Sequence, residues 1–281
     1  MLLNPLTIHL PKTTLEAARL FKELEDNKVL AGGTFLMNSL KLLKTKGTKT
    51  PRNILSLGHV EDLKGIATDK DQLTIKAMTT ITDLFESPLL IDNFKVLHTV
   101  CRNISTNPIR NMATVGGNLT CRYTWTEMGA VMIALDAQMH FMTADGKEEE
   151  ISAEDFFKNA ARTDKIFTHV TIKRDPAASI AYRRVKKTVH VDIPLLAVCV
   201  KTNLKAKQWS NTKVTVNSGI VFAQRDYGLE NFLNSAQSSA DLGQKALEHL
   251  TVPIYDTRSS EYKQHMFRVS IKSAIEEIVR G

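Results

Sequence analysis

The sequence predicts an α+β protein with two domains, because strands and helices are mixed in its first part and separated in its last third. A chain of 281 residues is long enough for two domains with a substantial core. Residues 1–175 read as a small βα unit followed by mixed strands and helices. Residues 176–281 read as an antiparallel sheet followed by helices. We therefore expect the domain boundary near Asp175 and Pro176.

Capping residues and hydrophobic spacing predict the elements of the N-terminal domain. Thr13 and Glu16 have the spacing of a capping box and should open a helix. Residues 27–31 form a strand pattern that leads into a glycine turn, and residues 34–44 return to helical spacing. The elements expected after these are a strand at 53–57, a hairpin at 65–77, a helix from 79, helices at 94–105 and 125–137, a hairpin at 138–151 and a strand at 166–172.

Three strand patterns followed by helical ones predict the small C-terminal domain. The strands are expected at 179–185, 195–202 and 213–220, and they should form a three-stranded antiparallel sheet. After Gly228 the spacing is helical, and residues 266–279 should form a closing helix.

Composition and charge exclude several classes of protein. A hydrophobic content of 43% and a charged content of 24% are ordinary for a globular protein. The net charge is +7, but the densest basic cluster, at 41–49, has no interleaved aromatic residues and reads better as a solvated helix end than as a nucleic-acid site. There is no secretory signal and no run of about 20 apolar residues that could span a membrane. We expect a soluble, cytoplasmic protein that does not bind nucleic acid.

The cysteines and histidines do not predict a metal site. The cysteines, Cys101, Cys121 and Cys199, are far apart, so we expect reduced thiols and no zinc or iron–sulfur ligands. The eight histidines are scattered and none pairs at metal-binding spacing. We also find no serine-nucleophile elbow and no Rossmann glycine motif.

Two stretches combine an apolar run, paired glycines and a small polar residue. They are Val-Leu-Ala-Gly-Gly-Thr at 29–34 and Asn-Pro-Ile-Arg-Asn-Met-Ala-Thr-Val-Gly-Gly-Asn-Leu at 107–119, here called the first and second glycine motifs. The pattern is typical of a strand that gives way to a turn, where glycines permit positive φ and close approach of a ligand. Free amides in such turns form anion-binding nests, and two nests could hold the phosphates of a dinucleotide. Tight turns that bind nothing are the alternative.

The second glycine motif, correctly spaced from the first, closely resembles the flavin-binding subunit of the molybdenum hydroxylases. That family includes xanthine dehydrogenase and the medium subunit of aerobic carbon monoxide dehydrogenase, and the resemblance covers nearly the whole chain. It implies an FAD-binding domain of the vanillyl-alcohol-oxidase/MurB-like (PCMH) type at residues 1–175. It also implies a C-terminal domain of the carbon monoxide dehydrogenase flavoprotein type at 176–281.

The same resemblance implies the site residues. Those that wrap the diphosphate and adenine half of FAD are Lys28, Val29, Leu30, Ala31, Gly32, Gly33, Thr34, Phe35, Leu36, Thr114, Gly116, Gly117 and Asn118. Ile104, Ser105 and Phe167 match positions beside the isoalloxazine ring. Arg184 and Lys187 match basic positions near the pyrimidine end of the flavin. Neighbouring alignments would use Arg183 instead, and an exposed basic strand is about equally consistent with these residues.

Two residues depart from the family pattern. Glu127 falls where the family has an aspartate that binds the ribityl chain, and Phe35 stands where aspartate commonly follows Ala-Gly-Gly-Thr. Both departures suggest an atypical branch of the family.

The resemblance implies an oxidoreductase subunit that relays electrons in a heteromeric molybdenum hydroxylase complex. Electrons would come from an iron–sulfur (2Fe-2S) subunit, which accompanies a molybdopterin-binding subunit, and would pass through FAD to NAD, a quinone or oxygen. Two alternatives remain open. One is a free-standing flavin oxidase, for which the sequence nominates no catalytic base. The other is a non-catalytic assembly subunit with a decayed flavin site.

Overall fold

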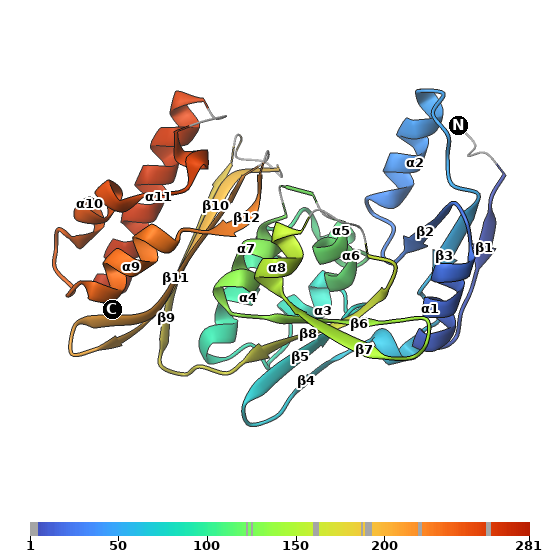
Figure 1. The fold of residues 1–281 in the computed structure, drawn as a ribbon, viewed down its shortest axis with the longest axis horizontal. Helices are drawn as coiled ribbons and strands as arrows, with labels where there is room; N and C mark the ends of the chain where they lie inside the picture. The colour runs from blue at the N-terminus through green and yellow to red at the C-terminus, as the bar shows by residue number, and fades with distance from the viewer. Residues whose placement is uncertain are drawn as a thin grey trace.

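The computed structural model describes residues 5–121, 123–124, 126–159, 163–186, 188, 193–218, 221–256 and 260–281. Figure 1 shows three groups of elements in a row: a βα unit that begins the chain, a central sheet with helices, and a sheet with helices that ends the chain. We call them the N-terminal, central and C-terminal units.

The N-terminal unit is a three-stranded parallel sheet with two helices. Its elements are β1 (Thr7–His9), α1 (Thr14–Glu23), β2 (Asn27–Leu30), α2 (Leu36–Thr45) and β3 (Asn53–Ser56). β3 lies in the middle and pairs in parallel with β1 and β2. Thr13 caps α1 as predicted, because its hydroxyl accepts the amide hydrogen of Glu16 at 3.2 Å. The carboxyl end of β2 leads directly into the first glycine motif.

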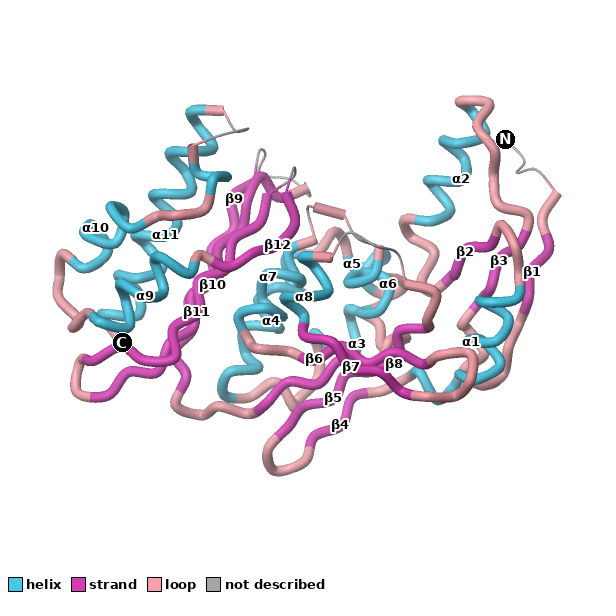
Figure 2. Tube along the Cα trace, in the orientation of Figure 1, coloured by secondary structure: helices cyan, strands magenta, loops and turns pink. Residues whose placement is uncertain are grey.

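The central unit is built on a five-stranded antiparallel sheet. Its strands are β4 (Ile66–Thr68), β5 (Gln72–Lys76), β6 (Gln138–Met142), β7 (Glu148–Ser152) and β8 (Ile166–Lys173), in the order β4-β5-β8-β6-β7. Its helices are α3 (Ile81–Phe85), α4 (Lys95–Asn103), α5 (Asn107–Arg110), α6 (Val115–Thr120), α7 (Glu127–Ala134) and α8 (Ala153–Lys158). Figure 2 shows these helices on one side of the sheet. Alternate residues of β6, Met139 and Phe141, point into the core on that side.

The two glycine motifs have different local structures. The first follows a strand, as predicted. The prediction is wrong for the second, where Gly116 and Gly117 lie in the first turn of α6 and no strand precedes them. The segment before these glycines is helical and not a strand, because Pro108 lies in the first turn of α5, a position that favours proline.

The C-terminal unit is a four-stranded antiparallel sheet with helices on one face. Its elements are β9 (Ala178–Lys186), β10 (Pro194–Lys205), β11 (Gln208–Ser218), β12 (Val221–Arg225), α9 (Tyr227–Ser235), α10 (Leu242–Ala246) and α11 (Glu261–Arg280). The strand order is β12-β11-β10-β9, so the three predicted strands are present and β12 adds a fourth. β12 was not predicted from the sequence, because its five residues show no clear alternation of apolar and polar side chains.

Two hydrophobic clusters hold the fold together. The larger one is centred on the central sheet and its helices and extends to α1 and β3 on one side and to Cys199 and Ala223 of the C-terminal sheet on the other. The second lies between the C-terminal sheet and α9, α10 and α11. All residues of α7 are buried, and this helix packs against β10, β11 and β12. Thr215 of β11 donates its hydroxyl hydrogen to the carbonyl oxygen of Ala130 in α7 at 2.8 Å. The C-terminal sheet is therefore covered on both faces.

All three cysteines are free thiols, and Cys101 and Cys199 are buried. Across the described residues, none of the helices has the length and apolar character needed to cross a bilayer.

Candidate functional site

The first glycine motif forms an open loop between β2 and α2. Gly33 has a φ of +72°, a conformation that glycine adopts without steric cost. The amides of Gly32, Gly33 and Thr34 donate no hydrogen bond to any part of the chain that the structure describes. Three consecutive free amides beside a positive-φ glycine are what a nest for anions requires.

The second glycine motif offers no such nest. The amides of Val115 and Gly116 donate to backbone carbonyl oxygens of Thr79 and Ala77, at 2.9 and 2.8 Å. The amide of Gly117 donates to the side-chain oxygen of Thr114 at 3.0 Å, so Thr114 caps α6. Our interpretation of this motif as a second phosphate nest is therefore wrong. These three amides all donate to acceptors within the chain, so they are not available to a ligand.

The glycines of the second motif serve close packing. A Cβ atom on Gly116 would lie 2.7 Å from the carbonyl oxygen of Ala77. A Cβ atom on Gly117 would lie 3.7 Å from the Cβ of Ala31 in the first motif. The two motifs also touch at Gly32, where an added Cβ would lie 1.9 Å from the carbonyl oxygen of Met112. Residues about 80 positions apart in the chain are thus in direct contact, and the two motifs form one continuous surface.

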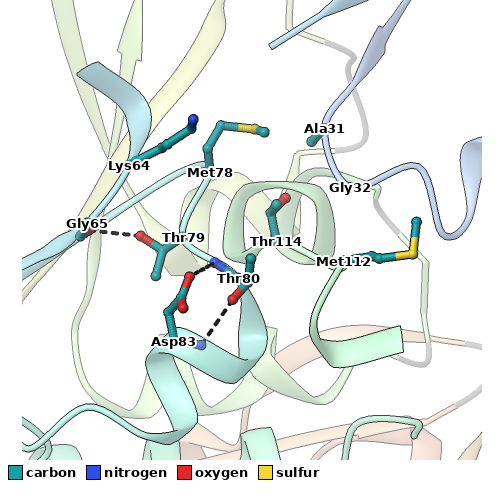
Figure 3. A pocket seen from close by; sticks show the side chains of 10 residues that line it. All are labelled: Ala31, Gly32, Lys64, Gly65, Met78, Thr79, Thr80, Asp83, Met112 and Thr114. Carbon is teal, nitrogen blue, oxygen red and sulfur yellow. Dashed lines mark hydrogen bonds between the residues drawn. The ribbon is translucent and has the colours of Figure 1, made fainter. Parts of the chain in front are cut away.

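A cavity of about 360 Å³ opens between the two motifs and the start of the central sheet. Its volume lies in the range of small-molecule sites. The lining residues, shown in Figure 3, are Ala31, Gly32, Lys64, Gly65, Met78, Thr79, Thr80, Asp83, Met112 and Thr114. In that view Met78 and Thr114 lie between the segment with Lys64 and the loop with Ala31. The cavity joins residues from both predicted motifs.

Most of the opposite wall of this cavity was not predicted from the sequence. Thr79 donates its hydroxyl hydrogen to the carbonyl oxygen of Gly65 at 2.8 Å, and Thr80 and Asp83 form the capping box of α3 (Figure 3). Thr80 is brought to the second motif by a β-bridge to Thr114. The cap of α3 was visible in the sequence, but its place opposite the glycine loop depends on tertiary pairing.

An aromatic contact connects the segments that follow the two glycine motifs. The rings of Phe35 and Tyr123 lie 4.1 Å apart at 48°. Phe35, the residue that replaces the usual aspartate, therefore packs on the segment that follows the second motif. Asn118 of α6 has a buried side-chain oxygen, Oδ1, without a hydrogen-bond partner within the described ranges.

The residues predicted beside the isoalloxazine ring are not brought to the cavity. Ile104 and Ser105 form a turn before α5, and the guanidinium of Arg110 donates to their carbonyl oxygens at 2.9 and 3.2 Å. Ser105 has a φ of +47°, a left-handed conformation that few residues other than glycine adopt. Phe167 is buried in the core and packs edge-on against Phe141, with ring centroids 5.4 Å apart.

Glu127 points into the protein. Its side chain is buried at the start of α7, and its Oε1 accepts a hydrogen bond from the hydroxyl of Tyr182 at 2.6 Å. The Nε of Arg184 lies 2.6 Å from the same oxygen, and both partners are almost fully buried. Burial raises the pKa of Glu127, against the opposing effects of Arg184 and Tyr182. Glu127 and Arg184, predicted at separate positions on the flavin, form one ion pair between α7 and β9.

The remaining predicted residues lie near the first motif or outside the described part of the chain. Lys28, Val29 and Leu30 are half-buried residues of β2, and Leu36 begins α2. Lys187 lies outside the described residues.

Comparison with protein families identifies the chain. Residues 4–173 match the model of the FAD binding domain in molybdopterin dehydrogenase. The chain belongs to this family. The chain is 24% identical over 274 residues to the glyceraldehyde dehydrogenase medium chain of Sulfolobus acidocaldarius, covering 94% of this chain and 95% of that protein. It is 27% identical over 291 residues to the carbon monoxide dehydrogenase medium chain of Afipia carboxidovorans, covering 95% and 94%.

Solved structures of the same kind show the fold. Carbon monoxide dehydrogenase from Hydrogenophaga pseudoflava matches with a TM-score of 0.87 at 22% identity, covering 98% of this chain and 97% of that one. Quinoline 2-oxidoreductase from Pseudomonas putida 86 matches with a TM-score of 0.84 at 19% identity, covering 100% and 97%. The family resemblance, the fold class and FAD as the cofactor are thus confirmed.

The geometry of the site fits FAD. The free amides at Gly32–Thr34 suit phosphate oxygens, and neither Gly32 nor Gly33 has a side chain of its own to block their approach. Thr114 lines the cavity, and the buried Oδ1 of Asn118, which has no hydrogen-bond partner among the described residues, belongs to the helix that Thr114 caps.

Proposed function

We propose that this chain is the FAD-binding medium subunit of a heteromeric molybdenum hydroxylase, with an iron–sulfur (2Fe-2S) subunit and a molybdopterin-binding subunit as partners. The observation that carries the proposal is the loop of free amides at Gly32–Thr34, which opens on a cavity in a chain of the FAD-binding family. Relatives that match along almost their whole length are named medium chains or medium subunits of dehydrogenases and a hydroxylase, which supports a role inside a complex.

The chain's own residues would bind and position the cofactor. The loop amides would hold the diphosphate, while Thr114 and Asn118 would supply polar contacts on the second motif. FAD, when bound, would supply the redox chemistry for an electron relay between a partner and NAD, a quinone or oxygen.

The cavity lining favours electron relay over oxidation of an organic substrate by this chain. Its titratable side chains are Lys64 and Asp83. Asp83 is engaged in the capping box of α3, and the ammonium of Lys64 lies 2.6 Å from a carboxylate oxygen of Glu61. Neither is placed as a general base. The intact amide loop, in turn, supports flavin binding over a decayed site.

We also propose that the N-terminal domain covers residues 1–175 and the C-terminal domain 176–281. Asp175 lies between the two units: its amide donates to Asn93 Oδ1 at 2.9 Å, and its carboxylate contacts Lys201 and Asn203 at 3.2 and 3.1 Å. One hydrophobic cluster lies wholly within residues 176–281, which supports this division, and the other includes only Cys199 and Ala223 of that range among its buried residues.

The test compares the full chain, loaded with FAD, alone and with its partner subunits. Purines, aldehydes and aromatic heterocycles serve as candidate substrates, and NADH with an artificial dye tests the flavin half-reaction. We expect flavin binding by the single chain, no oxidation of the organic compounds by it, and turnover when the partners are added. We also expect the assembled complex to bury a large surface on this subunit, on the order of 1,600 Å² or more.

Two results would contradict the proposal. Oxidation of any organic compound by the single chain would favour the free-standing oxidase. Failure of the single chain to bind flavin, with normal assembly of the complex, would favour the assembly subunit.

A further inference from the structure

Two histidines meet on the face of the central sheet that points away from the core. His140 of β6 and His169 of β8 are register partners on adjacent antiparallel strands. Their rings are parallel within 7°, and their centroids are 4.1 Å apart. The neighbours of His140 in β6, Met139 and Phe141, are buried in the core, so both histidines lie on the opposite face.

A glutamate from the edge strand reaches both rings. Glu148 Oε1 lies 3.8 Å from His140 Nδ1 and 3.6 Å from His169 Nδ1. One ligand atom from each of these three side chains lies within 4.8 Å of the other two. Ligand atoms of one zinc ion stand about 3.3 Å apart when the bonds are about 2.0 Å. Small side-chain rotations would therefore close the group around an ion.

Neighbouring groups orient this cluster. The hydroxyl of Thr171 lies 3.0 Å from His140 Nε2, which leaves Nδ1, the nitrogen that faces Glu148, for an ion. The hydroxyl of Thr168 lies 2.9 Å from His169 Nδ1, the nitrogen that also faces Glu148, so an ion bound at this nitrogen would replace that hydrogen bond. Metal-binding imidazoles are commonly held by a hydrogen bond on the other ring nitrogen, as Thr171 does for Nε2 of His140.

Two carboxylates near the cluster, those of Glu148 and Glu150, attract a cation, and one ammonium group, that of Lys76, opposes it. Glu150 of β7 places a carboxylate oxygen 3.9 Å from His140 Nε2. Lys76 of β5, the register partner of His169, is on the other side of the pair.

We infer that His140, Glu148 and His169 form a binding site for a divalent transition-metal cation of the zinc type. Imidazole nitrogens with a carboxylate oxygen are a zinc ligand set, whereas magnesium prefers oxygen ligands alone. None of the three residues lines the cavity between the glycine motifs, so this site is separate from the proposed flavin site. A bound ion would join three strands, β6, β7 and β8, and would tie the edge of the sheet to its centre.

The experiment uses the full chain with FAD and without an affinity tag, stripped with a chelator and titrated with ZnCl₂ by calorimetry. MgCl₂ is the control titrant. The test variants are His140→Asn and Glu148→Gln, and the matched control is His59→Asn, which changes an exposed histidine elsewhere. Glu148 is exposed, so its variant should fold even if the histidine variant does not.

We expect the unmodified chain and the His59→Asn control to bind one zinc ion, with no comparable binding of magnesium. Each test variant should bind zinc about tenfold more weakly or worse, because even the loss of a supporting group at a metal site costs that much. Zinc should also raise the thermal midpoint of the unmodified chain more than that of the variants. Absence of zinc binding, or zinc affinity retained in either folded test variant, would overturn the inference.

Discussion

Gly32 lies so close to Met112 that a Cβ atom on the glycine would sit 1.9 Å from the carbonyl oxygen of the methionine. The two glycine motifs are therefore joined through their backbones, without an intervening side chain. Because Gly33 is next in the chain, this contact fixes the position of the free amides relative to the cavity. The following predictions test the parts of this arrangement one at a time.

Replacing Gly33 with valine should abolish FAD binding in a chain that still folds. The left-handed φ of +72° would be strained by a branched side chain, and the new atoms would crowd Leu30 and the amide loop. Gly47→Val is the matched control, because Gly47 has a φ of +65° with no atom within 4 Å of an added Cβ. Each variant should lose about 1–3 kcal/mol of stability through backbone strain. Flavin absorbance after gel filtration should fall only for Gly33→Val, and full flavin occupancy in that variant would remove the loop from the site.

Removal of the cap of α6 should destabilise the second motif. Thr114→Ala deletes the oxygen that accepts the Gly117 amide, and this loss should cost about 1 kcal/mol of unfolding free energy. Thr114→Ser keeps that oxygen and should stay close to the unmodified chain. Urea denaturation of the three proteins measures the difference, and equal midpoints for the alanine and serine variants would show that the cap contributes nothing.

Glu127 should stabilise the fold chiefly through its buried ion pair with Arg184. Glu127→Gln leaves the Arg184 guanidinium buried without its counter-charge, which should cost about 3–5 kcal/mol. Tyr182→Phe deletes only a hydrogen bond to the same carboxylate and should cost about 1 kcal/mol. Denaturation of both variants, each with and without FAD, gives the comparison. If Glu127→Gln were as stable as the unmodified chain but bound FAD weakly, the carboxylate would act on the cofactor and not on the fold.

FAD should be bound without a covalent link. The two glycine motifs contain no cysteine or histidine, and Cys121 is the nearest cysteine after the second motif. Its thiol donates to the carbonyl oxygen of Asn118 at 3.1 Å, and burial raises its pKa, so the reactive thiolate is disfavoured. Acid precipitation should release all the yellow colour into the supernatant. Colour that stays in the protein pellet would show a covalent bond.

Local signals predicted much of the fold, because capping residues and hydrophobic spacing act over short distances. Thr13 and the first glycine motif are examples: the threonine caps α1, and Gly33 adopts the expected positive φ. The same reasoning failed at Gly116 and Gly117, because paired glycines after an apolar run look alike before a turn and within the first turn of a helix. Whether a turn or a helix forms depends on which carbonyl oxygens accept the amide hydrogens of Val115 and Gly116. Here the acceptors are Thr79 and Ala77, far back in the chain.

Long-range pairing explains what the sequence could not show. Thr80 reaches the site only through its bridge to Thr114, so no local spacing reveals it as a cavity residue. His140 and His169 are 29 positions apart, and only the register of β6 with β8 brings their rings together. The ion pair between Glu127 and Arg184 could not be predicted from local spacing either, because it forms only when α7 packs against the C-terminal sheet.

The edge strand β7 carries the run Glu148, Glu149 and Glu150, all exposed. An unpaired strand edge can recruit a strand from another molecule and start aggregation. A second copy that approached this edge in the antiparallel direction would bring glutamates against glutamates, which repel each other. The same acidic run that faces the histidine pair therefore disfavours pairing of this strand edge with a second copy of the chain.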